Sequence, residues 1–175
     1  MLINIKGGVV VLIDDADYPL ISGHEWQPMQ SKRTTYARCS IGNRTVRMHR
    51  LIMAAKPGIQ VDHRNGNGLD NRRENLRLAT SLQNGANKRT KGPASGFKGV
   101  YRTDRGKRWK AIITVGYKRQ HLGCFDTAQE AAAAYDKAAL EQFGEFACPN
   151  SAGRLLDGKL WDQFPAALKL EAIRP

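Results

Sequence analysis

Residues 61–87 read VDHRNGNGLDNRRENLRLATSLQNGAN, and this stretch decides both a local fold and a candidate chemistry. It places an acidic residue beside a histidine, Asp62 and His63, and two asparagines follow, Asn75 and Asn84. No other segment combines a possible metal ligand, a possible general base and a group to orient that base. The spacing therefore makes hydrolysis of a phosphodiester bond the hypothesis against which the rest of the sequence is weighed.

The same stretch predicts a compact strand–loop–strand–helix unit, because short apolar runs alternate with turn residues. A Ser or Thr directly before the last apolar run is a typical helix N-cap. The expected elements are a strand at 59–62, a tight turn at 65–68, a second strand at 76–78 and a helix from Thr80 or Ser81 to about Lys88.

Histidine suits the role of base because its unperturbed pKa lies near neutrality. Asp62 and Asn84 offer the oxygen ligands that a hard cation prefers, and phosphate would complete the shell. Side chains alternate along a strand, so His63 is expected on the opposite side from Asp62, and Asn75 could hydrogen-bond the imidazole. A simpler interpretation stays open from spacing alone: Asp-His before Asn-Gly turns is common loop chemistry, and Asn75 or Asn84 could cap backbone groups.

The charge of the chain indicates a polyanionic partner. Its 175 residues carry a net charge of +12, and the excess is clustered. Residues 31–50 contain six Lys or Arg and no acid, and residues 86–120 contain eleven against the single Asp104. Solvated surfaces normally mix the two signs, so these blocks favour nucleic acid over an anionic membrane, for which no basic amphipathic helix is present.

The three cysteines, Cys39, Cys124 and Cys148, are scattered, so neither a zinc site nor a disulfide framework is predicted. The sequence shows no signal-peptide pattern and no apolar run long enough to cross a bilayer. We therefore expect a cytoplasmic protein, in a bacterium or a phage-infected host, with no evident obligate protein partner.

Other elements flank the central unit. Before it, strands are predicted at 9–13, 36–41 and 44–46 and a helix at 48–55; His49 on that helix is expected to be structural or to contact phosphate, and His24 to be a packing or turn residue. After it, KRTKGPASG is typical of a linker. Strands at 99–102, 109–115 and 119–122 then lead to a helix at 128–143, which opens with a capping box, Thr127 and Glu130.

The run HRLIM…VDHRNGN…LDNRRENLR…T…QN, within residues 45–90, resembles the HNH homing-endonuclease family, in particular its phage and intron-encoded members. The resemblance implies a ββα-metal unit that binds one divalent cation and cuts DNA. It makes Asp62 and Asn84 metal ligands, His63 the general base and Asn75 the residue that positions it. Asn84 stands where many members carry histidine, and an amide oxygen favours Mg²⁺ or Mn²⁺ and disfavours zinc.

Residues 95–150 resemble the APETALA-type domain of ethylene-response factors, through GV at 99–100, WKAII at 109–113, LGCFDT at 122–127 and AAAAYDKAA at 131–139. This resemblance implies a three-stranded antiparallel sheet packed on one helix, with the sheet in the DNA major groove. The plant target sequence does not transfer, because Tyr101, Thr103, Thr114 and His121 stand where plant members often carry Arg or Trp. The expected DNA contacts over both halves are Arg72, Arg73, Arg77, Lys98, Arg102, Arg105, Arg108, Trp109, Lys110 and Arg119.

The sequence thus predicts an α+β chain in four parts: an HNH domain at 1–90 with its ββα-metal core at about 59–88, a linker at 91–96, an APETALA-type domain at 97–150 and a tail at 151–175 of unknown role. The expected function is metal-dependent, site-specific DNA cleavage, with nicking and double-strand cleavage both open. Two rivals remain. One is a non-catalytic DNA-binding regulator that keeps an HNH scaffold, and the other is an RNA-directed protein, which the lack of aromatic platforms disfavours.

Overall fold

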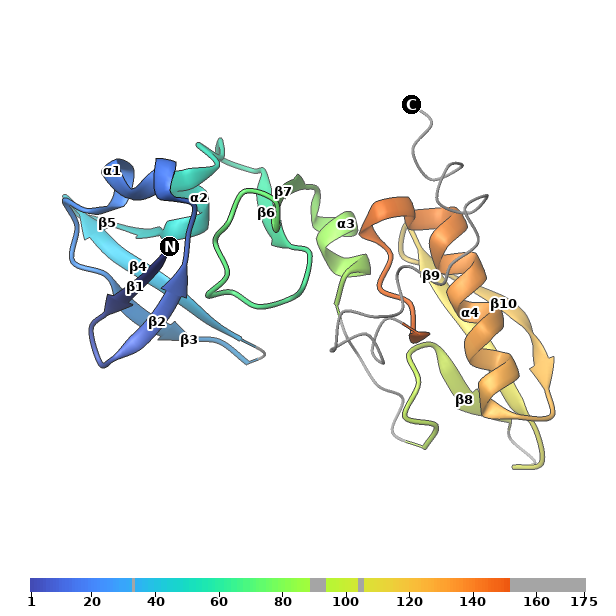
Figure 1. Ribbon diagram of the computed structural model, residues 1–175. Helices are drawn as coiled ribbons and strands as arrows, with labels where there is room; N and C mark the ends of the chain where they lie inside the picture. The colour runs from blue at the N-terminus through green and yellow to red at the C-terminus, as the bar shows by residue number, and fades with distance from the viewer. Residues whose placement is uncertain (33, 89–93, 104–105, 152–175) are drawn as a thin grey trace. The chain divides into compact units, whose positions relative to one another are not determined.

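A computed structural model describes residues 1–32, 34–88, 94–103 and 106–151, which form two compact units (Figure 1). The first unit is Met1–Gly85, and the second begins at Ala86. The described chain is a mixed α+β structure of small antiparallel sheets and few helices, as the sequence predicts. Arg105, residues 91–93 of the expected linker and residues 152–175 of the expected tail lie outside the described residues.

The first unit begins with a hairpin and a three-stranded sheet. The hairpin pairs β1 (Leu2–Ile5) with β2 (Val9–Leu12). The turn η1 (Asp15–Asp17) and the short helix α1 (Tyr18–Ile21) follow. The sheet has the order β3-β4-β5, with β3 at Gln27–Gln30, β4 at Thr35–Ile41 and β5 at Arg44–Arg47, and α2 (Met48–Ile52) comes directly after it.

Three differences from the sequence prediction concern local pattern. β1 and β3 were not predicted; β3 reads QPMQ, a sequence with little strand propensity that only the pairing to β4 holds extended. The helix expected at 48–55 ends at Ile52, because the backbone turns at Ala54, whose φ is +46°. These are short elements, for which tertiary pairing outweighs intrinsic preference.

The core of the first unit is made by alternate residues of its strands together with the inner faces of its helices. Cys39 and Ala37 point inward from β4, while Tyr36 and Arg38 occupy the other face of the strand. Val61 and Leu76 extend the same core into the central unit. The buried residues of this core are Ile5, Val11, Ile13, Ile21, Trp26, Ala37, Cys39, Met48, Ile52, Val61 and Leu76.

The central unit is built as predicted from two strands and a helix. β6 (Gln60–His63) pairs with β7 (Leu76–Ala79), and α3 (Ser81–Ala86) follows, shorter than the helix expected to reach Lys88. The intervening loop is tied to β2, because Leu12 N–H donates to Leu69 O at 2.9 Å and Asn71 N–H donates to Leu12 O at 2.7 Å. The hairpin is therefore anchored to the N-terminal strands.

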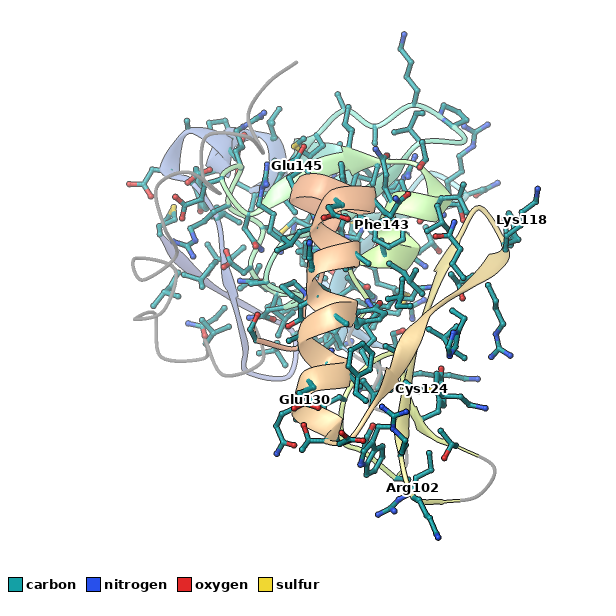
Figure 2. The ribbon with its side chains drawn as sticks, turned by 90° about the vertical axis from the view of Figure 1, so that its right-hand side faces the viewer. Arg102, Lys118, Cys124, Glu130, Phe143 and Glu145 are labelled. Carbon is teal, nitrogen blue, oxygen red and sulfur yellow. The ribbon has the colours of Figure 1, made fainter. Side chains whose placement is uncertain are left out.

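In the second unit, a three-stranded antiparallel sheet packs on one helix. The strands β8 (Val100–Arg102), β9 (Trp109–Val115) and β10 (Lys118–Phe125) have the order β10-β9-β8. The helix α4 (Ala128–Phe143) begins with the predicted capping box, in which Thr127 and Glu130 bond each other's backbone N–H, and is followed by η2 (Gly144–Phe146). In Figure 2, α4 runs along one face of the sheet, with Glu130 at its start and Phe143 at its end.

Small residues let α4 lie close to the sheet. Ala131 and Ala139 are almost fully buried against Val100, Ala111 and Ile113. Gly99 has a φ of +74°, and a Cβ there would lie 2.1 Å from Cδ2 of Tyr135. The alanine face and Tyr135 are thus core, as the sequence predicts.

Candidate active site

Asp62, on β6, forms a buried ion pair with Arg77 on β7. The two residues are directly opposite in the hairpin register. Oδ2 of Asp62 accepts from Arg77 Nη2 at 2.7 Å and from Nε at 2.9 Å, and both side chains are less than a tenth exposed. An ion pair on the surface contributes little to stability, whereas removing one member of a buried pair leaves the other charge without compensation. Any cation that binds Asp62 must share it with Arg77 or displace it.

Asn84, on α3, reaches the same face of β6. Its Nδ2 donates to Oε1 of Gln60, two residues before Asp62. Residues i and i+2 of a strand share a face, so Gln60 and Asp62 both point toward the side that α3 covers. The structure therefore places the two expected metal ligands on one side of the hairpin.

His63 points to the other face of β6, as strand alternation predicts, and it is 4% exposed. There its ring meets two others, Tyr36 of β4 and His49 of α2. Burial lowers the pKa of His63, while a polar interaction with Asn71 and the carboxylates of Asp62 and Asp70 act in the opposite direction. The imidazole is therefore kept neutral near pH 7, which is the state that a general base requires.

Asn75 holds the loop, and its side-chain hydrogen bonds do not go to the imidazole. Its Nδ2 donates to Asp70 O at 2.7 Å, and its Oδ1 accepts from Asn65 N–H at 3.0 Å. Its backbone O accepts from Arg64 N–H at 2.9 Å, directly after His63. Any influence of Asn75 on His63 thus runs through the loop backbone, contrary to the direct side-chain bond that the sequence suggested.

Asn71 was missed by the sequence analysis. It is fully buried and acts to raise the pKa of His63 against the effect of burial, although neither polar atom of its amide has a hydrogen-bond partner among the described residues. In the sequence it is one asparagine among several in a polar loop, and no periodic pattern distinguishes it. Its backbone N–H donates to Leu12 O, so its place beside the core depends on a contact with β2 that is distant in sequence.

His49 was placed outside the site by the sequence analysis, on the preceding helix. The structure buries it at 4% exposure against His63, so it is not a phosphate-contacting surface residue. Burial is the largest cause that lowers its pKa to about 3, followed by the repulsion that a protonated His63 would exert and by the positive charges of Arg47 and Arg50. His24, by contrast, lies edge-on to Trp26, with ring centroids 6.2 Å apart, in the packing role that was predicted.

The three arginines expected to clamp phosphate each have an acidic partner within the protein. Arg77 binds Asp62, as described above. Arg72 binds Asp70 through two hydrogen bonds of 2.9 and 2.8 Å, which lower the pKa of that carboxyl. Arg73 binds Asp17, with its shortest distance 2.7 Å, and also donates to Ile52 O. A phosphate contact by buried Arg77 would require its ion pair to open, whereas Arg72 and Arg73 remain partly exposed with their charge offset by an acidic neighbour.

The donor set fits a hard divalent cation. Asp62 supplies a carboxylate, and Asn84, whose Nδ2 is used by Gln60, has its amide oxygen left as a ligand. Mg²⁺ and Mn²⁺ accept such oxygens and keep several waters. Within the described ranges no group of three or more His, Cys, Asp or Glu side chains could hold a metal.

The residues expected to bind DNA in the second unit divide between the two faces of its sheet. Lys110 and Arg119 lie on the face opposite α4, since Lys110 alternates with buried Ala111 and Arg119 pairs with Thr114. Arg102 stacks on Trp109, 4.5 Å from the ring centroid, and this register pair shares the α4 side with Ala111. Figure 2 shows Arg102 and Lys118 at opposite ends of the sheet.

Two further basic residues of this unit have partners of their own. Arg108 donates to Asp126 Oδ1 at 2.8 Å and to Cys124 O at 2.9 Å. Lys98 donates to Ala86 O at 2.6 Å and lies 5.9 Å from the ring centroid of Tyr135, toward the helix. The described residues of the outward face are Tyr101, Lys110, Ile112, Thr114, Arg119, His121 and Cys124.

Comparison with known proteins adds two findings. Residues 46–86 match the model of a family described as HNH endonuclease. Over 149 residues the chain is 32% identical to an uncharacterised HNH endonuclease of Acanthamoeba polyphaga mimivirus. The aligned region covers 82% of this chain and 75% of the relative. In the part of the chain that the structure describes, no helix is long and apolar enough to cross a membrane.

Proposed function

The chain belongs to the HNH endonuclease family, and on that premise we propose that it hydrolyses DNA phosphodiester bonds at the β6–β7–α3 unit. His63 is the general base, and Asp62 and Asn84 hold the divalent metal ion that HNH nucleases generally use. The observation that carries the proposal is the arrangement of side chains on β6. Asp62 lies on the same face as Gln60, to which Asn84 donates a hydrogen bond. The neighbouring His63 lies on the opposite face, and its lowered pKa favours the neutral imidazole.

Each side chain has a separate task in this proposal. His63 takes the proton of the attacking water, and its lowered pKa keeps it able to do so at neutral pH. Asn75 holds the loop that follows the base, through Asn65 and Asp70. A bound cation, Mg²⁺ or Mn²⁺, supplies positive charge to the departing oxygen. We expect no zinc requirement, since the two protein ligands are oxygens.

The outward face of the second sheet is the surface that we assign to double-stranded DNA. It combines the positive charges of Lys110 and Arg119 with polar and apolar side chains such as Thr114 and Ile112, and none of the described strand residues on this face is acidic. A mixed face of this kind suits base edges beside phosphates. The role of this unit in choosing a target site, and its likeness to the APETALA-type domain, remain predictions.

A plasmid assay tests the cleavage proposal. Purified protein is incubated with supercoiled DNA with and without Mg²⁺ or Mn²⁺, beside His63→Ala, Asp62→Asn and the control His24→Ala. We expect metal-dependent open-circle product from the wild type and the control, with none from His63→Ala at unchanged DNA affinity. Linear product formed directly would indicate two sites acting together. Equal cleavage by His63→Ala would overturn the proposal.

A second function has one observation in its favour. His63 is 4% exposed and Asp62 is engaged by Arg77, which suits a DNA-binding regulator that keeps the HNH fold as a scaffold. The same assay separates the two functions. A regulator would bind DNA with any metal present and would leave plasmids that contain its bound sequence uncut.

A further inference from the structure

Three rings from three separate elements meet at the end of β6. His63 lies 5.0 Å from His49 and 5.7 Å from Tyr36, and His49 lies 5.3 Å from Tyr36, measured between ring centroids. Each ring therefore contacts the other two. The interplanar angle between the two imidazoles is 88°, so the contact of His49 with His63 is edge-on, an arrangement favoured by aromatic pairs.

The two partner rings are themselves held by independent contacts. His49 belongs to α2, whose Met48 and Ile52 are buried in the core. Tyr36 lies against the loop of the central unit: a Cβ on Gly68 would come within 2.6 Å of Cδ1 of Tyr36, and Gly68 N–H donates to Thr34 Oγ1 at 2.9 Å. The guanidinium of Arg47 covers Tyr36 at 5.5 Å from the ring centroid. Neither ring can shift without moving its neighbours.

A general base must present one nitrogen to the attacking water at a fixed distance and angle. An imidazole turns about two side-chain bonds, and a misplacement of about 1 Å can cost about 100-fold in rate. Hydrogen bonds to the ring fix one direction only, whereas rings packed on it restrict its tilt. His63 is the last residue of β6 and precedes a polar loop, so the residues next to it in sequence do not supply this restraint.

We propose that Tyr36 and His49 are positioning residues for His63, and that their rings form the wall that fixes the orientation of its imidazole. The inference rests on the proposed function, in which His63 is the base. It gives the N-terminal strands and α2 a role in cleavage: they carry the two rings to the hairpin. Neither ring touches the reacting atoms, so both act through His63.

The test compares ring-removing with ring-retaining variants of the full chain. His49→Ala and Tyr36→Ala are expected to slow single-turnover cleavage by about tenfold to 100-fold, with the DNA dissociation constant changed by less than about twofold. His49→Phe and Tyr36→Phe keep a ring edge and are expected to recover most of the rate. His24→Ala, which removes a ring contact with Trp26 elsewhere in the unit, is the matched control and should cleave normally.

A readout independent of cleavage follows the ring of His63 itself. In protein labelled at histidine, the ring-proton resonances of His63, assigned by comparison with His63→Ala, should shift and broaden in Tyr36→Ala and keep their wild-type width in Tyr36→Phe. Tyr36 is half-buried on the sheet surface, so this pair tests the inference even if His49→Ala fails to fold. Unchanged resonances in Tyr36→Ala would overturn it.

The failures of the two proposals are distinguishable. If His63→Ala cleaves as well as the wild type, His63 is not the base and the proposed function fails first. If His63→Ala is inactive while His49→Ala and Tyr36→Ala cleave at the wild-type rate, only the positioning role fails. A loss of rate that follows DNA affinity or melting temperature in proportion would also overturn the positioning role.

Discussion

The carboxylate of Asp62 and the guanidinium of Arg77 face each other across the β6–β7 hairpin, 2.7 Å apart and almost wholly buried. The expected metal ligand is therefore already paired with a cation of the protein. Loading a divalent ion at Asp62 becomes an exchange of one positive charge for another, and the free energy of that exchange sets the metal concentration that the site requires.

Replacing Arg77 by Met should destabilise the metal-free protein by about 3 kcal/mol, because it leaves a buried carboxylate without its partner. Mn²⁺ should recover part of this loss and should bind more tightly than to the wild type, since its competitor is gone. Urea unfolding and calorimetric titration measure the two effects. Arg108→Met, which breaks the exposed pair with Asp126, is the control and should cost less than about 1 kcal/mol. Equal stability of the Arg77 variant and the wild type would contradict this account.

Stability should fall as the pH is lowered through the acidic range. The pKa of His49 is lowered to about 3 in the folded protein, against 6.5 for the model group, so between these values the unfolded chain binds one more proton. The free energy of unfolding is therefore unaffected by His49 above pH 6.5, and it falls as the pH is lowered from 6.5 toward 3. The slope is about 1.4 kcal/mol per pH unit for one such group.

Urea unfolding at pH 7 and pH 5 measures this dependence. His49→Phe, which cannot take up the proton, should lose markedly less stability than the wild type over this range. His63, whose pKa is also lowered, contributes in the same direction in both proteins. Identical pH dependence in the two would show that His49 is not the residue responsible.

Gly68→Ala should disturb the site through Tyr36. The new Cβ would lie 2.6 Å from Thr35 O and from Cδ1 of Tyr36, so the ring or the loop must move. We expect a loss of about 1–3 kcal/mol and slower cleavage. Gly23→Ala is the matched control, because a Cβ there meets no atom within 4 Å and no positive φ is involved. Thermal unfolding of both variants decides the matter; equal melting temperatures would refute the close contact.

Arg119→Ala should weaken DNA binding and reduce the slope of log Kd against log salt by about one. Arg108→Ala should change the slope less, because its charge is already met by Asp126. Fluorescence anisotropy between low and moderate salt provides the measurement. If Arg108→Ala flattens the slope most, DNA binds another surface of this unit.

Much of the fold follows from patterns that are local in the chain. The start of the helix at Ala128 could be predicted, because Thr127 and Glu130 form a capping box that depends only on their spacing. The β6–β7–α3 order follows in the same way from short apolar runs and turn residues. β3 could not be predicted, since a four-residue strand that reads QPMQ has little propensity and is extended only where β4 lies beside it.

Sequence by itself determined the family of this chain and the choice of Asp62, His63, Asn75 and Asn84 as candidates, because spacing in a motif is a property of the chain alone. It also determined that Asp62 and His63 occupy opposite faces of β6, which follows from strand geometry. What lies on each face was decided only by the tertiary structure. Arg77 meets Asp62 through the hairpin register, and Tyr36 and His49 meet His63 through packing between elements distant in sequence. Contacts of this kind depend on how the elements pack, and no local pattern of residues encodes them.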